Sequence, residues 1–251
     1  MIAKQKVTLI IPCKNEEKSI AGLLKKVPSC VDEVIVVNNN STDKTAAVAK
    51  KHGAKVVTEN RTENGIGYGY AHQAGIKKAT GDIIVTLDGD GSYPSYQIKA
   101  AVNYLLKNKL DFVSCNRFPL TNTHAISWIR QLGVWILNTE VRVLFGYRMQ
   151  DILSGMWIVR KSVAKKMQLR SGGWNLSPEI KLIALMNPTI SFGEYHINHH
   201  YRSGGVSKQI IWKTGFEHLF YIFHLWIWRC NPLRVSIFTA HAKCTAYNAQ
   251  F

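Results

Sequence analysis

Two acidic residues one position apart, Asp88 and Asp90, follow an apolar run at residues 83–87 that predicts a buried strand. Carboxylates are ligands for hard divalent cations, and proteins usually hold Mg²⁺ by one or two carboxylates while substrate phosphates complete its shell. A Mg²⁺ or Mn²⁺ ion on these residues would suit the diphosphate of a nucleotide sugar. Taken alone, the Asp-Gly-Asp triplet is more typical of a turn, so the metal interpretation needs support from the rest of the chain.

Four cations stand in predicted loops or near the ends of predicted elements: Arg117, Arg130, Arg202 and Lys208. A guanidinium group binds phosphate oxygens through two parallel hydrogen bonds, so two or more of these side chains could form one anion site. In a basic chain most such residues are simply solvated. Residues 201–208 are more suggestive, because two glycines let the backbone close over a ligand while a cation stands on either side, and we predict a lid-like loop.

Further polar groups have a structural and a functional interpretation. Residues 38–45 follow a predicted strand and can cap the next helix or bind a base and ribose; Asp43 is their only carboxylate. Asp151 can pair with an arginine or face the same sheet edge as the acidic pair. Residues 64–69 are rich in glycine but lack the spacing of a phosphate loop, so we interpret them as a flexible helix entry near a ligand.

Three histidines, His196, His199 and His200, resemble a metal cluster. They fall on a predicted strand, where adjacent side chains face opposite sides of the sheet. We therefore do not expect a zinc site there.

The elements that position these residues alternate between strands and helices. Predicted strands cover residues 7–12, 33–37, 55–58, 83–87 and 112–115, and predicted helices cover 19–26, 42–52, 69–79 and 95–107. This alternation predicts an α/β fold with a mostly parallel sheet flanked by helices. Ligands bind such sheets at the carboxyl ends of the strands, where the four polar segments 12–16, 38–43, 88–90 and 116–117 all fall.

The second half of the chain predicts a long helix at 125–145, a strand at 156–159, helices at 161–167 and 178–186, and a strand at 189–201. An apolar stripe on the long helix is explained by core packing; it contains Trp128, Leu132, Trp135, Ile136 and Val143. Residues 219–228 are aromatic and apolar, but the run is shorter than the roughly 20 residues that span a bilayer. We predict an amphipathic or interfacial segment there, with a core helix as the alternative. The expected boundary separates a catalytic domain at 1–215 from a C-terminal segment at 216–251.

Composition narrows the choice of partner. The chain has 251 residues, 46% of them hydrophobic, and a formal charge of +16, which excludes extended disorder and favours an anionic partner. The cations are spread along helices instead of clustering with aromatics, so we do not expect a nucleic-acid partner. The five cysteines have no metal-site spacing and favour a reducing compartment, and the N-terminal residues do not resemble a signal peptide.

Taken in order, seven segments resemble the dolichyl-phosphate mannosyltransferase-like, polyprenyl-phosphate branch of the family 2 glycosyltransferases, which have a GT-A, Rossmann-like fold. The segments are 11–16, 39–43, 79–82, 87–91, 116–118, 151–155 and 202–208. The resemblance implies that the nucleotide sugar is bound by Pro12, Asn15, Glu16, Asn39, Asp43 and Asp88, with Asp88 and Asp90 on a Mg²⁺ or Mn²⁺ ion. It places the acceptor phosphate on Arg117, Arg130, Arg202 and Lys208, and it implies that Asp90, Arg117 and Asp151 serve catalysis.

Some positions depart from that family's pattern. Asn38 and Asn39 stand where many members have acidic residues, which bears on the base preference, and Ser92 stands where close relatives often have a metal-holding glutamine. The 202–208 loop is one residue longer than the commonest form.

The resemblance implies an inverting enzyme that moves a sugar from GDP-mannose or a UDP-hexose to dolichyl or undecaprenyl phosphate. One alternative keeps the fold but uses a hydroxyl acceptor on a polysaccharide or glycan, with Asp151 as the base. A non-catalytic basic module that binds nucleic acid is a further alternative. If the acceptor is a polyprenyl phosphate, we expect a peripheral protein on the cytoplasmic face of a membrane, which could also bind a membrane-protein partner.

Overall fold

Seven strands form one sheet with the spatial order β3-β2-β1-β4-β6-β5-β7. They are β1 (Val7–Cys13), β2 (Glu33–Asn39), β3 (Lys55–Glu59), β4 (Ile83–Thr86), β5 (Phe112–Asn116), β6 (Trp157–Arg160) and β7 (Phe192–His196). All pairings are parallel except those of β6, which runs antiparallel to both β4 and β5. The computed structural model describes residues 2–63, 66–122, 125–204 and 207–230. The predicted mostly parallel α/β sheet is confirmed.

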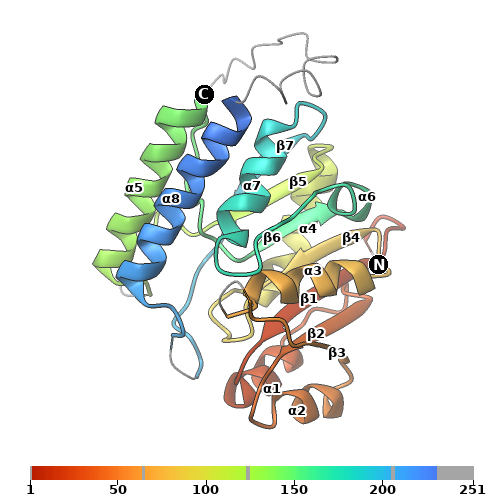
Figure 1. Cartoon of the computed structure of the whole chain (residues 1–251). Helices are drawn as coiled ribbons and strands as arrows, with labels where there is room; N and C mark the ends of the chain where they lie inside the picture. The colour runs from red at the N-terminus through yellow and green to blue at the C-terminus, as the bar shows by residue number, and fades with distance from the viewer. Residues whose placement is uncertain (1, 64–65, 123–124, 205–206, 231–251) are drawn as a thin grey trace.

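Helices cover both faces of this sheet (Figure 1). They are α1 (Glu17–Lys25), α2 (Thr45–Lys51), α3 (Tyr68–Lys78), α4 (Ile98–Lys107), α5 (Trp128–Phe145), α6 (Lys161–Ala164), α7 (Leu176–Met186) and α8 (Ile211–Cys230), with a short 3₁₀ helix, η1 (Ser95–Gln97), before α4.

The central strands are continuous apolar runs because both of their faces are covered. All seven residues of β1 are buried, and alternate residues point to opposite sides of a strand. Leu9 and Ile11 accordingly belong to a core shared with α1, α2 and α4, whereas Ile10 belongs to a second core shared with α3, α6 and α7.

Two predicted elements in the second half are shorter than expected. The strand predicted at 189–201 is shorter and covers only β7 (Phe192–His196). The last hydrogen bond to β5 is from Ile197 N to Asn116 O, at 2.9 Å, and the chain leaves the sheet beyond it. The helix predicted at 161–167 ends at Ala164. Helix α8 begins at Ile211 and runs across the expected domain boundary at 215/216, and residues 231–251 of the predicted C-terminal segment lie outside the described part.

The prediction that core packing explains the apolar stripe of α5 is wrong. Trp128, Trp135 and Val143 are 71%, 65% and 75% exposed, and Leu132 and Ile136 are exposed as well. The helix packs through another stripe, in which Val141 and Phe145 join Leu182 of α7 and Ile222 of α8 in a third core. Apolar residues recur on two faces of this helix, and the periodicity alone did not distinguish the buried face from the exposed one.

Helix α8 lies beside α5 at one edge of the molecule (Figure 1). One face of α8 supplies Ile222 and Leu225 to the third core. The opposite stripe is exposed and contains Trp212, Phe216, Phe220, Phe223 and Ile227. We call the exposed apolar stripes of α5 and α8 together the apolar helix face. Within the described residues no helix combines the length and the hydropathy needed to cross a membrane.

Candidate functional site

A cavity of about 630 Å³ opens at the carboxyl edge of the sheet. Residues that follow four different strands line it, as the strand-end argument predicts: Pro12 and Glu16 near the end of β1, Asn39 at the end of β2, Asp88 and Asp90 after β4, and Arg117 after β5. Arg130 of α5 and the loop residues Arg202 and Lys208 complete its polar part. The structure therefore brings most of the predicted site residues together.

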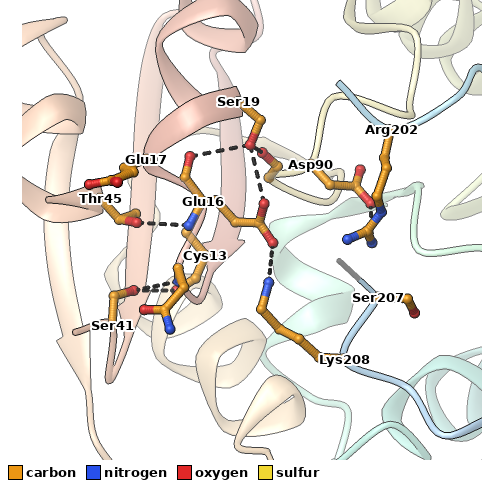
Figure 2. Close-up of polar contacts among 12 residues, drawn as sticks. Cys13, Glu16, Glu17, Ser19, Ser41, Thr45, Asp90, Arg202, Ser207 and Lys208 are labelled. Carbon is orange, nitrogen blue, oxygen red and sulfur yellow. Dashed lines mark hydrogen bonds and ion pairs between the residues drawn. The ribbon is translucent and has the colours of Figure 1, made fainter. Parts of the chain in front are cut away.

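Glu16 sits at the base of α1 and is held from several sides (Figure 2). Its N–H donates to Thr45 Oγ1 at 2.8 Å, and Ser19 Oγ donates to its carboxylate at 3.2 Å. Lys208 Nζ lies 2.5 Å from Glu16 Oε1, so a residue that follows β7 pairs with this acid after β1. Residues 205–206 of the predicted lid-like loop lie outside the described part. Glu16 is thereby fixed in a charged, almost buried pair.

Asn39 is buried at the end of β2. Its side-chain N–H donates to Ile66 O at 3.0 Å, which fixes the orientation of the amide. The amide oxygen has no hydrogen-bond partner among the described residues. A buried acceptor without a partner in a cavity wall is suited to a ligand donor.

The structure does not place Asn15 and Asp43 in the cavity wall, where the resemblance predicted them. Asn15 has a positive φ of 53° and accepts from Thr42 N at 2.8 Å. Asp43 accepts from Glu17 N at 3.1 Å and from Thr45 N at 3.0 Å. Both side chains fasten the loop after β1 to the loop after β2, so they act on the pocket through the backbone.

The acidic pair is held asymmetrically. Asp90 accepts from Arg202 Nη2 at 2.8 Å (Figure 2). It also accepts from Ser92 N and Oγ at 2.9 and 2.6 Å. Asp88 accepts from Tyr68 OH at 2.9 Å. Burial and, second to it, the negative charge of Asp90 together raise the pKa of Asp88 to about 7.

These two carboxylates fit a divalent cation. A cation between them would relieve the repulsion that raises the pKa of Asp88, and both line the cavity. No cluster of three or more His, Cys, Asp or Glu in the described part of the chain could hold a metal. The protein therefore offers two carboxylates to a metal ion, which suits Mg²⁺ or Mn²⁺ with phosphate oxygens of the ligand in the remaining coordination positions.

Three arginines face the cavity beside the acidic pair. Arg117 donates to Asp151 through Nε at 2.6 Å and Nη2 at 2.9 Å. Arg130 Nη2 donates to Ser207 Oγ at 2.7 Å. Burial lowers the pKa of Arg130, and the charges of Arg202 and Arg117 lower it further. Arg202 Nη1 is buried and finds no partner within the described residues, so it is a donor available to an anion.

Asp151 lies behind Arg117, outside the cavity wall, and its side chain is fully buried. Burial alone would raise its pKa, but Arg117 outweighs this effect and the pKa is lowered. Lys181 of α7, also buried, donates to Ile152 O and Ser154 O at 2.7 Å each and fixes the following turn. This geometry favours Asp151 as the residue that holds Arg117, over the base that a hydroxyl acceptor would need.

Several cavity residues were not predicted as site residues: Tyr68, Tyr93, Trp174, Ser177, His199 and His218. Tyr68 carried a signal, because it lies between Gly67 and Gly69 in the glycine-rich helix entry, and His199 belonged to the histidine cluster for which no zinc site was expected. The others come from α7, α8 and turns whose approach depends on tertiary packing. His199 is buried against Tyr93, whereas His196 is exposed and contacts Pro119 O at 2.8 Å.

The other end of the cavity is apolar. Its wall consists of residues from α5 and the turn before it and from α8: Ile126, Trp128, Ile129, Leu132, Ile136, Ile211, Trp212, Phe216 and Leu219. Some of these residues, among them Trp128 and Trp212, also belong to the apolar helix face. The cavity thus runs from two acids and three arginines to an exposed apolar surface.

Residues 8–168 match the sequence profile of Glycosyl transferase family 2. An uncharacterized glycosyltransferase of Mycobacterium bovis is 32% identical over 82% of this chain and 91% of its own length. A dodecaprenyl-phosphate galacturonate synthase of Rhizobium johnstonii is 29% identical over 83% of this chain and 63% of its own length. Among solved structures, glucosyl-3-phosphoglycerate synthase from Mycobacterium tuberculosis, in complex with Mn²⁺, uridine diphosphate and phosphoglyceric acid, superposes with a TM-score of 0.68. It is 18% identical, and the match covers 91% of this chain and 80% of that one.

Proposed function

This chain belongs to glycosyl transferase family 2, and from that premise we propose that it moves a sugar from a nucleoside diphosphate donor to the phosphate of a polyprenyl lipid. The observation that carries the proposal is a single cavity in which the acidic pair, the three arginines and an apolar wall meet. The acidic pair suits a metal-bound diphosphate donor, the three arginines suit an anionic acceptor, and the apolar wall suits a hydrocarbon chain.

On the donor side, Asp88 and Asp90 would hold a Mg²⁺ or Mn²⁺ ion. The synthase from Mycobacterium tuberculosis with a similar fold contains Mn²⁺ and uridine diphosphate, which supports a metal and a nucleoside diphosphate here. When bound, such an ion supplies Lewis-acid stabilisation of the charge that develops on the leaving diphosphate. Pro12, Glu16 and Asn39 line the part of the cavity next to this pair and would form the base and ribose site.

On the acceptor side, Arg117, Arg130 and Arg202 would bind the lipid phosphate. Burial lowers the pKa of Arg130, and the nearby charges of Arg202 and Arg117 lower it further; a bound anion would offset the repulsion among the three guanidinium groups. Lys208 is 2.5 Å from Glu16 and would have to leave it to reach a phosphate. The relative from Rhizobium johnstonii is a dodecaprenyl-phosphate galacturonate synthase by name, which supports a polyprenyl phosphate as the acceptor here.

Catalysis in this site reduces to positioning and electrostatics. A phosphate monoester is already anionic at neutral pH, so its oxygen attacks the anomeric carbon without a general base. The new carbon–oxygen bond forms as the bond to the diphosphate breaks and its electron pair leaves with the nucleoside diphosphate. Arg117, held by Asp151, would keep the acceptor in line with that bond, and a single displacement inverts the anomeric configuration.

The apolar helix face would rest in the lipid surface. Aromatic side chains such as Trp128 and Trp212 suit the headgroup region, and the charge of +16 suits an anionic leaflet. Because the face is continuous with the apolar wall of the cavity, a lipid phosphate could enter while its chain stays in the membrane. We therefore propose that the protein acts at a membrane surface as a peripheral enzyme.

The test combines purified protein, Mn²⁺ or Mg²⁺, a panel of UDP and GDP sugars and a short polyprenyl phosphate, with mass spectrometry of the lipid product. We expect product from wild type, none from Asp90→Ala and strongly reduced amounts from Arg117→Ala. Arg160→Ala is the matched control, because Arg160 pairs with Asp111 and does not line the cavity. Turnover of hydroxyl acceptors alone would reject the lipid-phosphate acceptor and favour the glycan alternative.

A further inference from the structure

The two carboxylates of the acidic pair have partners of different charge. Asp90 pairs with the guanidinium of Arg202. Asp88 accepts one side-chain hydrogen bond among the described residues, from the neutral hydroxyl of Tyr68 at 2.9 Å. A guanidinium competes with a metal for the charge of a carboxylate, whereas a phenol orients the carboxylate and leaves its charge in place.

Tyr68 is held firmly enough to orient another group. It is the first residue of α3, it follows Gly67 at φ 80°, and only 8% of it is exposed. Its ring lies 4.7 Å from the ring of Trp174 and packs edge-on against His72 at 4.6 Å. Two rigid rings therefore fix where the hydroxyl points.

The backbone around Tyr68 is fixed as well. Gly69 N donates to Gly172 O at 2.9 Å, and a Cβ on Gly69 would lie 2.1 Å from Ser171 O. The start of α3 thus docks directly on the segment before α7. This close approach places Tyr68 against Trp174 from an element distant in sequence.

Asp88 is confined on its other side by backbone. A Cβ on Gly155 would lie 2.8 and 2.9 Å from the two carboxylate oxygens of Asp88, so only a glycine allows the carboxylate to occupy this position. Gly155 is itself held, because its N–H donates to Tyr93 OH at 2.6 Å and its carbonyl accepts from Thr86 Oγ1 at 3.0 Å. With Gly155 on one side, the hydroxyl of Tyr68 determines how the carboxylate turns toward the cavity.

We infer that Tyr68 is a positioning residue for the donor complex, which orients Asp88 for a divalent cation and the nucleoside diphosphate bound to it. The inference rests on the proposed donor site, and it does not depend on the identity of the acceptor. Tyr68 acts through Asp88 and leaves the charge of that carboxylate available to the cation.

The test uses Tyr68→Phe, which removes the hydroxyl and keeps the ring that packs on Trp174 and His72. Calorimetry measures the binding of UDP and of GDP in the presence of Mn²⁺, and paramagnetic resonance measures the binding of Mn²⁺ alone. For the nucleotide that binds wild type, we expect about ten-fold weaker Mn²⁺-dependent binding, because a hydrogen bond to a charged group is lost. The melting temperature should change little.

A double-mutant cycle with Asp88→Asn separates positioning from a general structural effect. If Tyr68 acts through Asp88, adding Tyr68→Phe to Asp88→Asn should weaken Mn²⁺ and nucleotide binding no further. The cycle remains decisive if Tyr68→Phe lowers the melting temperature. Tyr221→Phe is the matched control, since Tyr221 donates to the carboxylate of Glu179 at 2.8 Å away from this cavity; nucleotide affinity should stay at the wild-type value.

The outcomes distinguish the two proposals. The role of Tyr68 is overturned if Tyr68→Phe binds Mn²⁺ and nucleotide as tightly as wild type does. It is also overturned if Tyr68→Phe reduces the affinity by the same factor in wild type and in Asp88→Asn. Wild-type protein that binds Mn²⁺ and nucleotide but forms no glycolipid overturns the proposed acceptor and leaves the inference on Tyr68 standing.

Discussion

At the scale of single residues, the pair of Arg117 and Asp151 fixes how the cationic group faces the cavity. We predict that Asp151→Asn lowers the free energy of unfolding by about 3–5 kcal/mol, because removal of one partner leaves the other charge buried without compensation. Urea titration at neutral pH measures the loss. Glu59→Gln, which weakens a pair whose arginine, Arg61, is half exposed, should cost about 1 kcal/mol or less. Equal effects of the two variants would contradict the importance of burial.

The same pair predicts a pH dependence. The folded pKa of Asp151 is lowered, since Arg117 outweighs the effect of burial. A carboxylate of this kind stabilises the fold above its unfolded pKa of about 4, and the contribution disappears as the pH falls through the folded pKa. The stability difference between wild type and Asp151→Asn should therefore stay constant near neutrality and shrink below about pH 4. A difference that persists in strong acid would point to a shape effect of the substitution.

His72 predicts a second acid effect. Burial lowers its pKa to about 3, and neither ring nitrogen has a partner within the described structure. Between its unfolded pKa of about 6.5 and the folded value, the unfolded chain binds a proton that the folded chain does not, so stability falls as the pH falls. We expect His72→Phe, which keeps a ring against Trp157, to flatten this decline in urea titrations from pH 7 to pH 4. Parallel curves for the two proteins would contradict the prediction.

The sequence predicted the site residues that follow strands but not those brought in by packing. Glu16, Asn39, Asp88 and Arg117 lie where parallel strands end, and that rule placed them on one edge before the fold was known. Trp174 and His199 reach the same cavity from segments with no comparable rule. Residue type and position were not sufficient for Asn15 and Asp43. Both are polar residues after strands, but their side chains accept hydrogen bonds from the neighbouring loop and do not line the cavity.

At the scale of elements, a glycine after the end of a helix stabilises the fold, whereas a glycine inside a helix destabilises it. Gly146 follows the last residue of α5 at φ 77°, with nothing near the position of a Cβ, and its N–H closes the helix on Arg142 O at 3.1 Å. Gly146→Ala should lower the free energy of unfolding by about 1 kcal/mol, through backbone strain alone. Thermal or chemical unfolding measures the change.

Gly22 provides the matched comparison. It lies inside α1, and a Cβ there would also meet nothing within 4 Å. Gly22→Ala should raise stability by about 0.5–1 kcal/mol, because alanine loses less backbone entropy in a helix. If both substitutions change stability in the same direction, the explanation by backbone conformation fails.

Helix α5 also shows what element patterns leave open. Its boundaries were predicted closely, since the long apolar repeat is a local signal. Which face packs was predicted wrongly, because that depends on α7 and α8, which come later in the chain. The exposed stripe on α5 is one of the features on which the proposed membrane docking rests.

At the scale of the whole molecule, the apolar helix face and the net charge predict how the protein partitions to lipid. Wild type should sediment with vesicles that contain an anionic phospholipid, and added salt should weaken the association. Trp135→Ser together with Phe220→Ser should weaken it by at least about ten-fold, because both side chains are exposed on this face. Tyr96→Ser, at an exposed aromatic outside α5 and α8, is the control.

The paired substitutions also separate docking from chemistry. Trp135 and Phe220 do not line the cavity, so transfer to a short acceptor in detergent should remain at the wild-type rate. Vesicle binding that is unaffected by the paired substitutions would assign the lipid contact to another surface.

The architecture as a whole was largely predictable, because alternating strand and helix patterns restrict a chain to a few sheet topologies. The position of β6 was not predictable in this way. Its four residues give no indication of direction, and its antiparallel pairing with β4 and β5 is set by the long connection through α5.

That position of β6 has a consequence for synthesis on the ribosome. Strands β4 and β5 follow one another in the chain, yet β6 separates them in the sheet. Until residues 157–160 have emerged, one edge of β4 therefore lacks its neighbour, and β5 has no neighbour on either edge because β7 is also still missing. Translation that stalls before this point should leave a fragment that aggregates or binds chaperones, whereas a stall after β7 should leave a chain in which all seven strands can pair.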